Sequence, residues 1–383
     1  MDNVLKSIAA KESQALQFLE RLVNIDSGID NPDGIAEVAH IIGDRLLTMG
    51  FTVEYIEHPG ICTHVLARKK GTTGNTPVMI TGHMDTVFPR GTAAARPFTI
   101  KGEMAYGPGV LDMKGGITTA LTALEALYES GWNDKDITVF FCGDEETGHP
   151  HTDAVDYFKK VAAGQAAVFN MESGRPDGAV VIGRKGGIKP VVEIEGKTAH
   201  AGNEPEKGAN ALLEMVYKLA DIQKITDKER GISVNVGVIR GGVADNVVPA
   251  EAIAKIDIRF SKVDDADGIL NALREIAAKN YVAGTKTVLK GDRIVYMPME
   301  TTAGGQKLFE LVQAKGRQLG IPEIGGMVVG ASSDSCWTTI AGAPTVCSMG
   351  PRGGLNHSER EYIFVDGLVE RAKLLALCLT EKL

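Results

Sequence analysis

The chain of 383 residues is longer than one hydrophobic core usually serves, so we expect two domains. Its 44% hydrophobic and 23% charged residues are typical of a globular enzyme, and a net charge of -8 without a Lys/Arg stripe argues against nucleic-acid binding. Residues 1–23 lack a secretory apolar core, and no apolar run approaches the roughly 20 residues that span a bilayer, so we expect no membrane partner and a cytoplasmic location.

Helices and short apolar strands alternate through the first half of the chain. Helical periodicity is found at residues 13–24, 35–49, 116–130 and 153–163. Apolar strands are expected at residues 52–57, 63–68, 77–81, 137–142 and 166–171. This alternation predicts a largely parallel sheet that is covered by helices on both faces.

From about Gly187 the pattern changes to β-α-β-β-α-β, which is the order of the ferredoxin-like motif. These six elements are expected at residues 188–195, 208–223, 232–239, 250–260, 264–279 and 287–289. After Pro298 the α/β pattern resumes, with helices at 306–319 and 365–380 around a strand at 345–348. The sequence therefore predicts one α/β domain at 1–186 and 296–383, and an inserted α+β domain at 187–295. The exposed sheet edge of such an insertion commonly pairs with another copy.

Five cysteines lie far apart and form no C-x-x-C pair. We expect them to be reduced and mostly buried rather than paired in disulfides or gathered around zinc. A nucleophilic cysteine is the alternative, although most such cysteines are inert core residues. Any metal site must therefore be built from histidine and carboxylate.

The strand at 137–142 ends close to three consecutive carboxylates, Asp144, Glu145 and Glu146. Carboxylates that are pushed together raise one another's pKa, and away from water they need a partner. No Lys or Arg lies within several residues, so a metal ion is the economical counter-charge. Adjacent side chains point in different directions, so one glutamate can hold metal while the other carries protons. An acidic, solvated turn is the alternative, because Asp and Glu are mostly exposed.

Two more polar segments flank predicted elements. His83 and Asp85 are two residues apart after a strand, so Asp85 can accept the second N–H of the His83 ring, as around a metal-bound imidazole. A polar loop with an incidental His–Asp hydrogen bond is the alternative. Asp112 precedes a helix in YGPGVLDMKGG, where Gly115 follows Lys114 and neither a Walker nor a G-x-G-x-x-G pattern is met. A carboxylate there repels phosphate and attracts a cation, and a structural role is the alternative.

Glu172 follows the strand at 166–171, and His357 lies in a late polar loop; either residue alone is more readily explained as structural. Together, the candidate ligands in loops of one predicted sheet are His83, Asp112, Glu146, Glu172 and His357. Ligands of open α/β sheets bind at the carboxyl ends of the strands, so this coincidence predicts a metal site. Histidine and carboxylate suit Zn²⁺, and Mn²⁺ or Co²⁺ are further candidates.

The segments GHMDTV, YGPGVLDMKGG, GDEETG, the strand end at Glu172, GKTAHAG and NHSEREY resemble, in order and spacing, the zinc-dependent aminoacylase/carboxypeptidase superfamily. This group includes glutamate carboxypeptidases of the bacterial G type, acetylornithine deacetylases and succinyl-diaminopimelate desuccinylases. The likeness covers almost the whole chain, and GKTAHAGNEPEKGANAL and HMDTVFPRG are closest to the glutamate carboxypeptidase branch. It implies a three-layer α/β zinc-exopeptidase-type catalytic domain with an inserted ferredoxin-like dimerisation, or lid, domain.

The resemblance also implies a role for each candidate ligand. Asp112 would bridge two zinc ions. His83 and Glu172 would complete one ion, and Glu146 and His357 would complete the other.

Three catalytic roles follow from the same resemblance. Glu145 would be the general base for the water that attacks the amide carbonyl, and would later protonate the leaving amine. Asp85 would orient His83. His200, in GKTAHAG, would stabilise the oxyanion in the active site of a partner subunit, so a homodimer is implied. The alternative for His200 is a solvent-exposed loop histidine.

Three residues are implied to bind substrate. Asn246 and Arg259 match family positions that bind a free carboxylate, which arginine pairs with bidentately; the alternative for Arg259 is the solvent face of a strand. Ser333 lies in a loop, GASSDS, that resembles a Gly-Gly-Ser/Thr-Asp-Ala loop near the site. This chain has Ala331 and Ser332 where Gly-Gly is usual, so side chains there narrow the pocket.

The predicted function is a dinuclear zinc metallopeptidase that hydrolyses the amide bond of a small peptide or N-acyl amino acid with a free C-terminal carboxylate, with glutamate release as one candidate reaction. An N-acyl-amino-acid deacylase of metabolism is the alternative, and the GKTAHAG region argues mildly against it. A non-catalytic peptide-binding relative is a third hypothesis. The presence of Glu145 argues against it, because a binding protein needs no general base.

Overall fold

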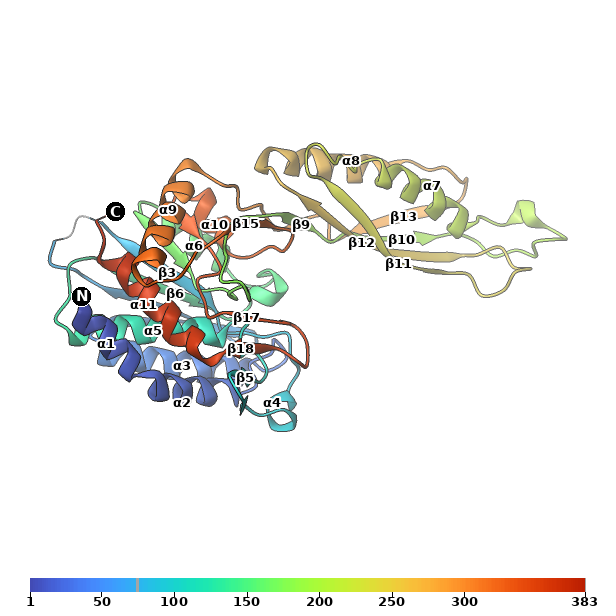
Figure 1. Cartoon of the computed structure of the whole chain (residues 1–383). Coiled ribbons are helices and arrows are strands. Elements are labelled where there is room, and N and C mark those ends of the chain that lie inside the picture. The colour runs from blue at the N-terminus through green and yellow to red at the C-terminus, as the bar shows by residue number, and fades with distance from the viewer. Residues whose placement is uncertain (74–75, 383) are drawn as a thin grey trace. The chain divides into compact units, whose positions relative to one another are not determined.

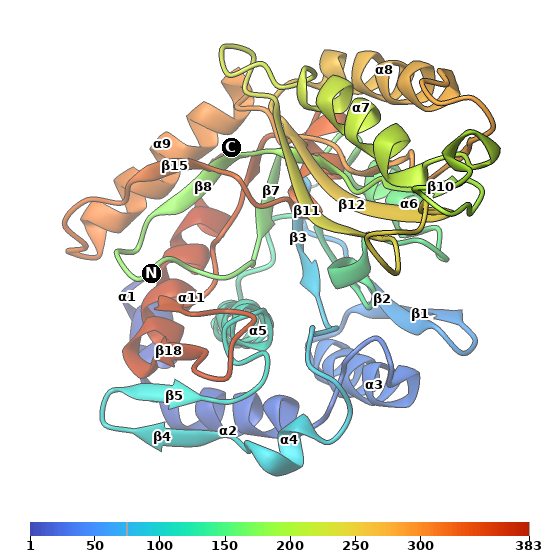
Figure 2. The same cartoon turned by 90° about the vertical axis from the view of Figure 1, so that its right-hand side faces the viewer.

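The computed structural model describes residues 1–73 and 76–382, and the chain forms two compact units (Figures 1 and 2). The larger unit comprises Met1–Ile182, Thr301–Val328 and Trp337–Leu383. The smaller unit comprises Gly183–Glu300 and Val329–Cys336. Among the described residues, no helix combines the length and the apolar character that crossing a bilayer requires. All five cysteines are buried, as expected.

A six-stranded sheet with the order β1-β2-β6-β3-β7-β16 forms the middle of the larger unit. Its strands are β1 (Thr52–His58), β2 (Cys62–Lys69), β3 (Val78–His83), β6 (Ile137–Cys142), β7 (Ala167–Asn170) and β16 (Thr345–Val346). The neighbours β6, β3, β7 and β16 run parallel, as predicted, whereas β2 is antiparallel to both β1 and β6. The connection from β1 to β2 is only residues 59–61, which is too short for the crossover that parallel strands need.

Helices cover both faces of this sheet, which confirms the predicted three-layer α/β architecture. The longer helices of this unit are α1 (Asp2–Ala10), α2 (Glu12–Val23), α3 (Pro32–Thr48), α5 (Lys114–Glu129), α6 (Ala154–Ala162), α9 (Ala303–Gln318) and α11 (Val365–Thr380). The chain also has the short helices α4 (Thr92–Ala95) and α10 (Ser335–Ile340). Successive residues of β6 face opposite layers. Phe141 belongs to the main core with α3, α5 and α11, while Phe140 meets Phe158 of α6 edge to face at 4.7 Å.

A small four-stranded sheet, β17-β18-β5-β4, carries two loops of the larger unit. Its strands are β4 (Thr99–Lys101), β5 (Met104–Tyr106), β17 (Gly353–Gly354) and β18 (Tyr362–Phe364). Tyr106 of β5 pairs with Tyr362 of β18. This pairing brings the loop after β5 beside the loop between β17 and β18. The strands β8 (Val180–Arg184) and β15 (Gly326–Val329) pair with each other.

The smaller unit contains the predicted β-α-β-β-α-β succession. Its elements are β10 (Val191–Glu195), α7 (Ala211–Gln223), β11 (Ser233–Gly241), β12 (Glu251–Phe260), α8 (Ala266–Ala278) and β13 (Lys286–Lys290). The strand order β13-β10-β12-β11 is that of a ferredoxin-like sheet. Both helices pack on one face, where Ile256, Ile258 and Phe260 are buried. Asp257 and Arg259 alternate with them and lie on the open face.

The prediction of one strand over residues 188–195 was wrong. The structure has β9 (Gly186–Ile188) and then β10, with Pro190 between them. Proline has no N–H for a sheet ladder, and here its carbonyl accepts the N–H of Ile256. Strand β9 pairs instead with β12 and with β14 (Ile294–Tyr296), which the sequence pattern did not indicate.

Candidate metal centre

Five loops of the larger unit bring the predicted ligands together. His83 ends β3, Asp112 precedes α5, and Glu146 lies in the 3₁₀ turn Glu145–Thr147 after β6. Glu172 follows β7, and His357 lies between β17 and β18. The possible ligand atoms form two groups, and within each group all atoms lie within 4.8 Å of one another. The first group comes from His83, Asp112 and Glu172, and the second comes from Asp112, Glu146 and His357. Asp112 is the member that the two groups share.

The contacts of Asp112 are those expected of a bridging carboxylate. Its Oδ1 lies 3.2 Å from Nε2 of His83, and its Oδ2 lies 3.1 Å from Nε2 of His357. Nε2 of His83 is also 3.9 Å from Oε1 of Glu172, and Nε2 of His357 is 3.4 Å from Oε2 of Glu146. Each oxygen of Asp112 thus faces a different histidine–glutamate pair, and these imidazole and carboxylate groups are the donor types that divalent metal ions such as zinc take in proteins.

Asp85 contacts His83 differently from the sequence-based expectation. Nδ1 of His83 lies 2.9 Å from the backbone carbonyl oxygen of Asp85 and 3.5 Å from its carboxylate Oδ1. Strand β3 ends at His83, and Asp85 lies beyond it. The carboxylate instead accepts the backbone N–H groups of Glu145 and Glu146, at 3.1 and 2.9 Å. Asp85 therefore connects the His83 loop to the turn that carries both glutamates.

The three consecutive carboxylates do not act as one group. Oδ1 of Asp144 is 2.7 Å from Nδ1 of His149, and its Oδ2 accepts the hydroxyl of Thr152 at 2.7 Å. Burial opposes ionisation of Asp144, but these contacts hold the pKa of its carboxyl below the ordinary value. His149, which the sequence-based interpretation did not include, is therefore a partner of Asp144.

The carboxylates and histidines of the cluster shift one another's pKa values. Burial, and then Asp112, raise the pKa of Glu146 to about 7. Asp112 and Glu146 raise the pKa of His357 to about 11. Burial opposes the charged form of His83, but hydrogen bonds to Asp112 and Asp85 raise its pKa well above the ordinary value. The carboxylates therefore favour the protonated form of both histidines, and a cation held by the same atoms would take the place of those protons.

The affinity of the protein for Zn²⁺ is expected to rise steeply between pH 6 and pH 8. The folded-state pKa values of His83 and His357 are raised, so below them both rings carry protons that must leave before they can ligate. Each displaced proton contributes about tenfold in Kd per pH unit, so the two histidines give about 100-fold, and below about pH 7 a proton on Glu146 adds to the slope. Competition with a fluorescent chelator measures this slope. His357→Ala should reduce the pH slope of Zn²⁺ affinity by one proton. The control His40→Ala, on the exposed side of α3, should leave the slope unchanged. An affinity that does not vary with pH would contradict the assignment of these histidines as ligands.

Sequence reasoning missed two residues that hold Asp112 in place. Oε1 of buried Glu361 accepts the backbone N–H groups of Leu111 and Asp112, at 2.7 and 2.9 Å. Nδ2 of Asn356 donates to Oδ2 of Asp112 at 2.9 Å. Burial, and then the charge of Asp112, raise the pKa of Glu361 to about 8. Both residues are in the segment NHSEREY. Every residue of this segment but the last is plainly polar, so the sequence gives no signal that distinguishes a residue that supports Asp112 from a metal ligand.

The other predicted site residues belong to the smaller unit. Nδ1 of exposed His200 accepts the N–H groups of Gly202 and Asn203, both at 3.1 Å, so the proton of the neutral ring is on Nε2. The backbone carbonyl of Asn246 accepts the N–H of Ala201 at 3.0 Å, which places Asn246 beside the His200 segment. Arg259 donates a hydrogen bond to Ser332, which belongs to the segment 329–336. Ser333 is the next residue of this segment and is buried.

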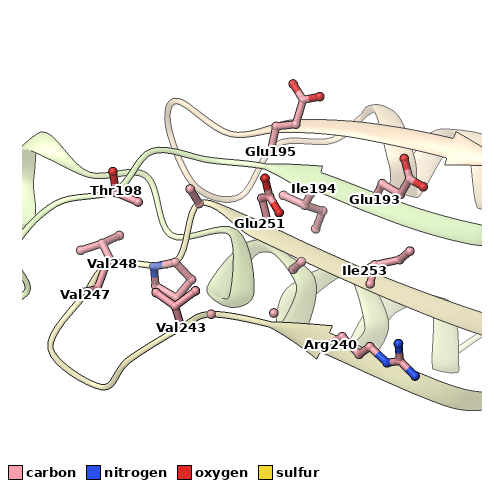
Figure 3. Close-up of a pocket in the computed structure, with 15 residues that line it drawn as sticks. Glu193, Ile194, Glu195, Thr198, Arg240, Val243, Val247, Val248, Glu251 and Ile253 are labelled. Atoms are coloured by element: carbon pink, nitrogen blue, oxygen red, sulfur yellow. The ribbon is translucent and has the colours of Figure 1, made fainter.

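A pocket of about 650 Å³ also lies in the smaller unit. It is lined by parts of β10, β11 and β12 and by the loop that joins β11 to β12 (Figure 3). Its charged lining residues are Glu193, Glu195, Glu251 and Arg240, and none of the predicted metal ligands is among its lining residues. This pocket is therefore separate from the cluster of predicted metal ligands.

Comparison with known proteins identifies a consistent set of relatives. The model of Peptidase family M20/M25/M40 matches residues 79–381. Carboxypeptidase G2 of Pseudomonas sp. (strain RS-16) is 32% identical over 98% of this chain and 91% of that protein. A succinyl-diaminopimelate desuccinylase of Dechloromonas aromatica (strain RCB) is 28% identical over 63% of this chain and 67% of its own length. The solved M20 family metallo-carboxypeptidase Sso-CP2 of Sulfolobus solfataricus has a TM-score of 0.78 at 18% identity, covering 96% of this chain and 98% of that one.

Proposed function

Because the chain belongs to peptidase family M20/M25/M40, we propose that it is a dinuclear zinc carboxypeptidase that cleaves the amide bond beside a free C-terminal carboxylate in a small peptide or N-acyl amino acid. The family makes the protein a metal-dependent hydrolase of amide bonds, with carboxypeptidase-like relatives. The number of metal ions, their identity as zinc and the substrate are the proposal.

The observation that carries the proposal is the position of Asp112 between two histidine–glutamate pairs. His83 and Glu172 would hold one ion, and Glu146 and His357 the other, with Asp112 shared. When bound, such a pair of ions lowers the pKa of a water and polarises a carbonyl. The remaining chemistry belongs to side chains of this chain.

Glu145 would move the proton. Its backbone N–H is held by Asp85, and its side chain is buried next to Glu146, so it is fixed at the edge of the ligand cluster. In the reaction it would accept a proton from the attacking water and return it to the leaving amine. His200 would donate its Nε2–H to the oxyanion, and Arg259 would bind the substrate carboxylate, together with Asn246 and Ser333.

We also propose a homodimer formed through the smaller unit, which would be the dimerisation or lid domain. Strand β11 pairs with β12 on one edge, and no other strand in the described part of the chain pairs with its second edge. Three large apolar side chains on α7, Leu213, Val216 and Tyr217, are exposed with helical spacing, and Val216 is 60% exposed. An unpaired edge and an apolar helix face are surfaces that a second copy can cover. The cytoplasm remains the expected location.

A deacylase of N-acyl amino acids is the second candidate. The 28% identity to a succinyl-diaminopimelate desuccinylase supports it over part of the chain, whereas the 32% identity to Carboxypeptidase G2 extends over 98% of the chain. The coverage therefore favours the carboxypeptidase, with glutamate release as one candidate reaction. A non-catalytic peptide-binding relative is the least supported, because Glu145 is retained beside the cluster.

A substrate screen tests the proposal. The protein, loaded with Zn²⁺, Mn²⁺ or Co²⁺, is offered dipeptides, N-acyl amino acids and folate-like glutamates, each as the free acid and as the C-terminal amide. We expect hydrolysis of peptide or acyl-glutamate acids but not of their amides, with loss of activity in a chelator. Faster turnover of N-acyl diamino acids would favour the deacylase. Tight metal binding without turnover of any substrate would contradict the proposal.

A further inference from the structure

Two neighbours in the smaller unit hold the guanidinium of Arg259. Its Nε donates to Oδ1 of Asp257 at 2.7 Å, and its Nη2 donates to Oδ2 of the same residue at 2.9 Å. The residues are two apart on β12, so both side chains lie on the open face of the sheet. A bidentate pair of this kind fixes the plane of the guanidinium as well as its position.

The third contact comes from the loop at 329–336. Nη1 of Arg259 donates to Oγ of Ser332 at 3.1 Å. The Ser332 hydroxyl itself donates to the carbonyl of Lys185 at 2.8 Å, so a lone pair of Oγ is directed toward Arg259. Nη1 of Arg184 also donates to the Ser332 carbonyl at 3.1 Å. Ser332 is thus held through both its side chain and its backbone carbonyl. It occupies one of the two positions where the resemblance leads us to expect glycine.

These contacts leave a defined part of Arg259 for a ligand. A guanidinium has five N–H groups in a fixed, planar arrangement. In the described part of the chain, Asp257 uses one on Nε and one on Nη2, and Ser332 uses one on Nη1. One N–H remains on each of Nη1 and Nη2. Two donors on one rigid plane match the two oxygens of a single carboxylate.

We propose that Asp257 and Ser332 are positioning residues that preorganise Arg259 to bind one planar carboxylate, the C-terminal group of the substrate. This inference rests on the proposed function. Asp257 also balances the charge of Arg259, so recognition depends on hydrogen-bond geometry more than on net charge. The arrangement therefore selects a planar carboxylate over a tetrahedral anion such as a sulfonate.

Asp257→Asn and Ser332→Gly test this assignment. Asparagine keeps the size of Asp257 but offers one acceptor in place of two, so Arg259 loses its bidentate anchor. We expect kcat/KM for the carboxylate substrate to fall about tenfold, mainly through KM, because one charge-assisted hydrogen bond is removed. The matching N-acyl aminosulfonate is tetrahedral and does not depend on the plane of the guanidinium, and Asp257→Asn also leaves Arg259 without its balancing charge, so the sulfonate should lose nothing and the carboxylate-to-sulfonate preference should collapse. Ser332→Gly should shift the same preference by about threefold.

Controls separate this inference from its premise. Asp267→Asn, on the exposed side of α8, should leave the preference unchanged, and metal content and Tm should match the wild type in all variants. Asp257→Glu, which keeps two acceptor oxygens, should restore part of the preference. If the wild type cleaves no substrate with a C-terminal carboxylate, the proposed function fails. The positioning role is tested separately. It is overturned if the wild type cleaves such substrates and Arg259→Lys impairs this cleavage, but neither Asp257→Asn nor Ser332→Gly alters the carboxylate-to-sulfonate preference.

Discussion

Replacing Glu145 by glutamine is expected to lower kcat by about 10³-fold or more while the metal content stays unchanged, because general acid–base catalysis typically contributes about 10²–10⁴-fold. Glutamine has the same shape but cannot take up a proton. The hydrogen bond from the backbone N–H of residue 145 to the carboxylate of Asp85 does not involve the substituted side chain, so this contact is kept. Steady-state kinetics and metal analysis on the same preparation give the two readouts.

The neighbouring residue provides the comparison that separates the two glutamates. Oε2 of Glu146 lies 3.4 Å from Nε2 of His357, so Glu146→Gln should release metal and lose turnover together. Glu54→Gln, on the exposed strand β1, should change neither readout. If Glu145→Gln lost the metal while Glu146→Gln kept it and still failed to turn over, the two roles would have to be exchanged.

The sequence pattern was sufficient for most of the architecture because buried strands and amphipathic helices have strong periodicities. The segment Ile137–Cys142 is mostly apolar and buried at every residue, and it forms β6 in the middle of the sheet. The pattern failed at Pro190, because apolar residues on both sides of Lys189 and Pro190 concealed the break between β9 and β10. It also could not indicate the direction of β2, which depends on the short turn before it and not on its composition.

The candidate site was predictable in its residue types but not in its contacts. Strand ends marked His83, Glu146 and Glu172, because polar residues directly after buried strands lie at one edge of a sheet. Which neighbour each atom faces depends on turns that leave no periodic signal. Asp144 turns to His149, and Glu361 supports Asp112 from a loop that is distant in the sequence.

His200→Ala is expected to lower kcat by about 10²–10³-fold with metal content intact, because this is the usual contribution of one oxyanion donor. Two further variants separate the donor at Nε2 from the acceptor at Nδ1, which accepts the N–H groups of Gly202 and Asn203. Asparagine at position 200 keeps an oxygen near the place of Nδ1 but has no donor at Nε2, so it should be as impaired as alanine. Glutamine supplies a donor near Nε2 and should retain more activity. Full activity of His200→Ala would remove the oxyanion role.

A mixing experiment shows whether His200 acts in its own subunit or in its partner. In the proposed homodimer, Glu145→Gln chains alone and His200→Ala chains alone, carrying different affinity tags, are each expected to be nearly inactive. In a mixed dimer, the site on the His200→Ala chain has its own Glu145 and can receive His200 only from the other chain. If His200 acts across the interface, random mixing of equal amounts makes half of the dimers mixed, each with one complete site, and about a quarter of the wild-type activity returns. If His200 acts within its own chain, every site lacks one of the two residues and no activity returns, so the proposed exchange between subunits would be wrong even where both single variants behave as expected.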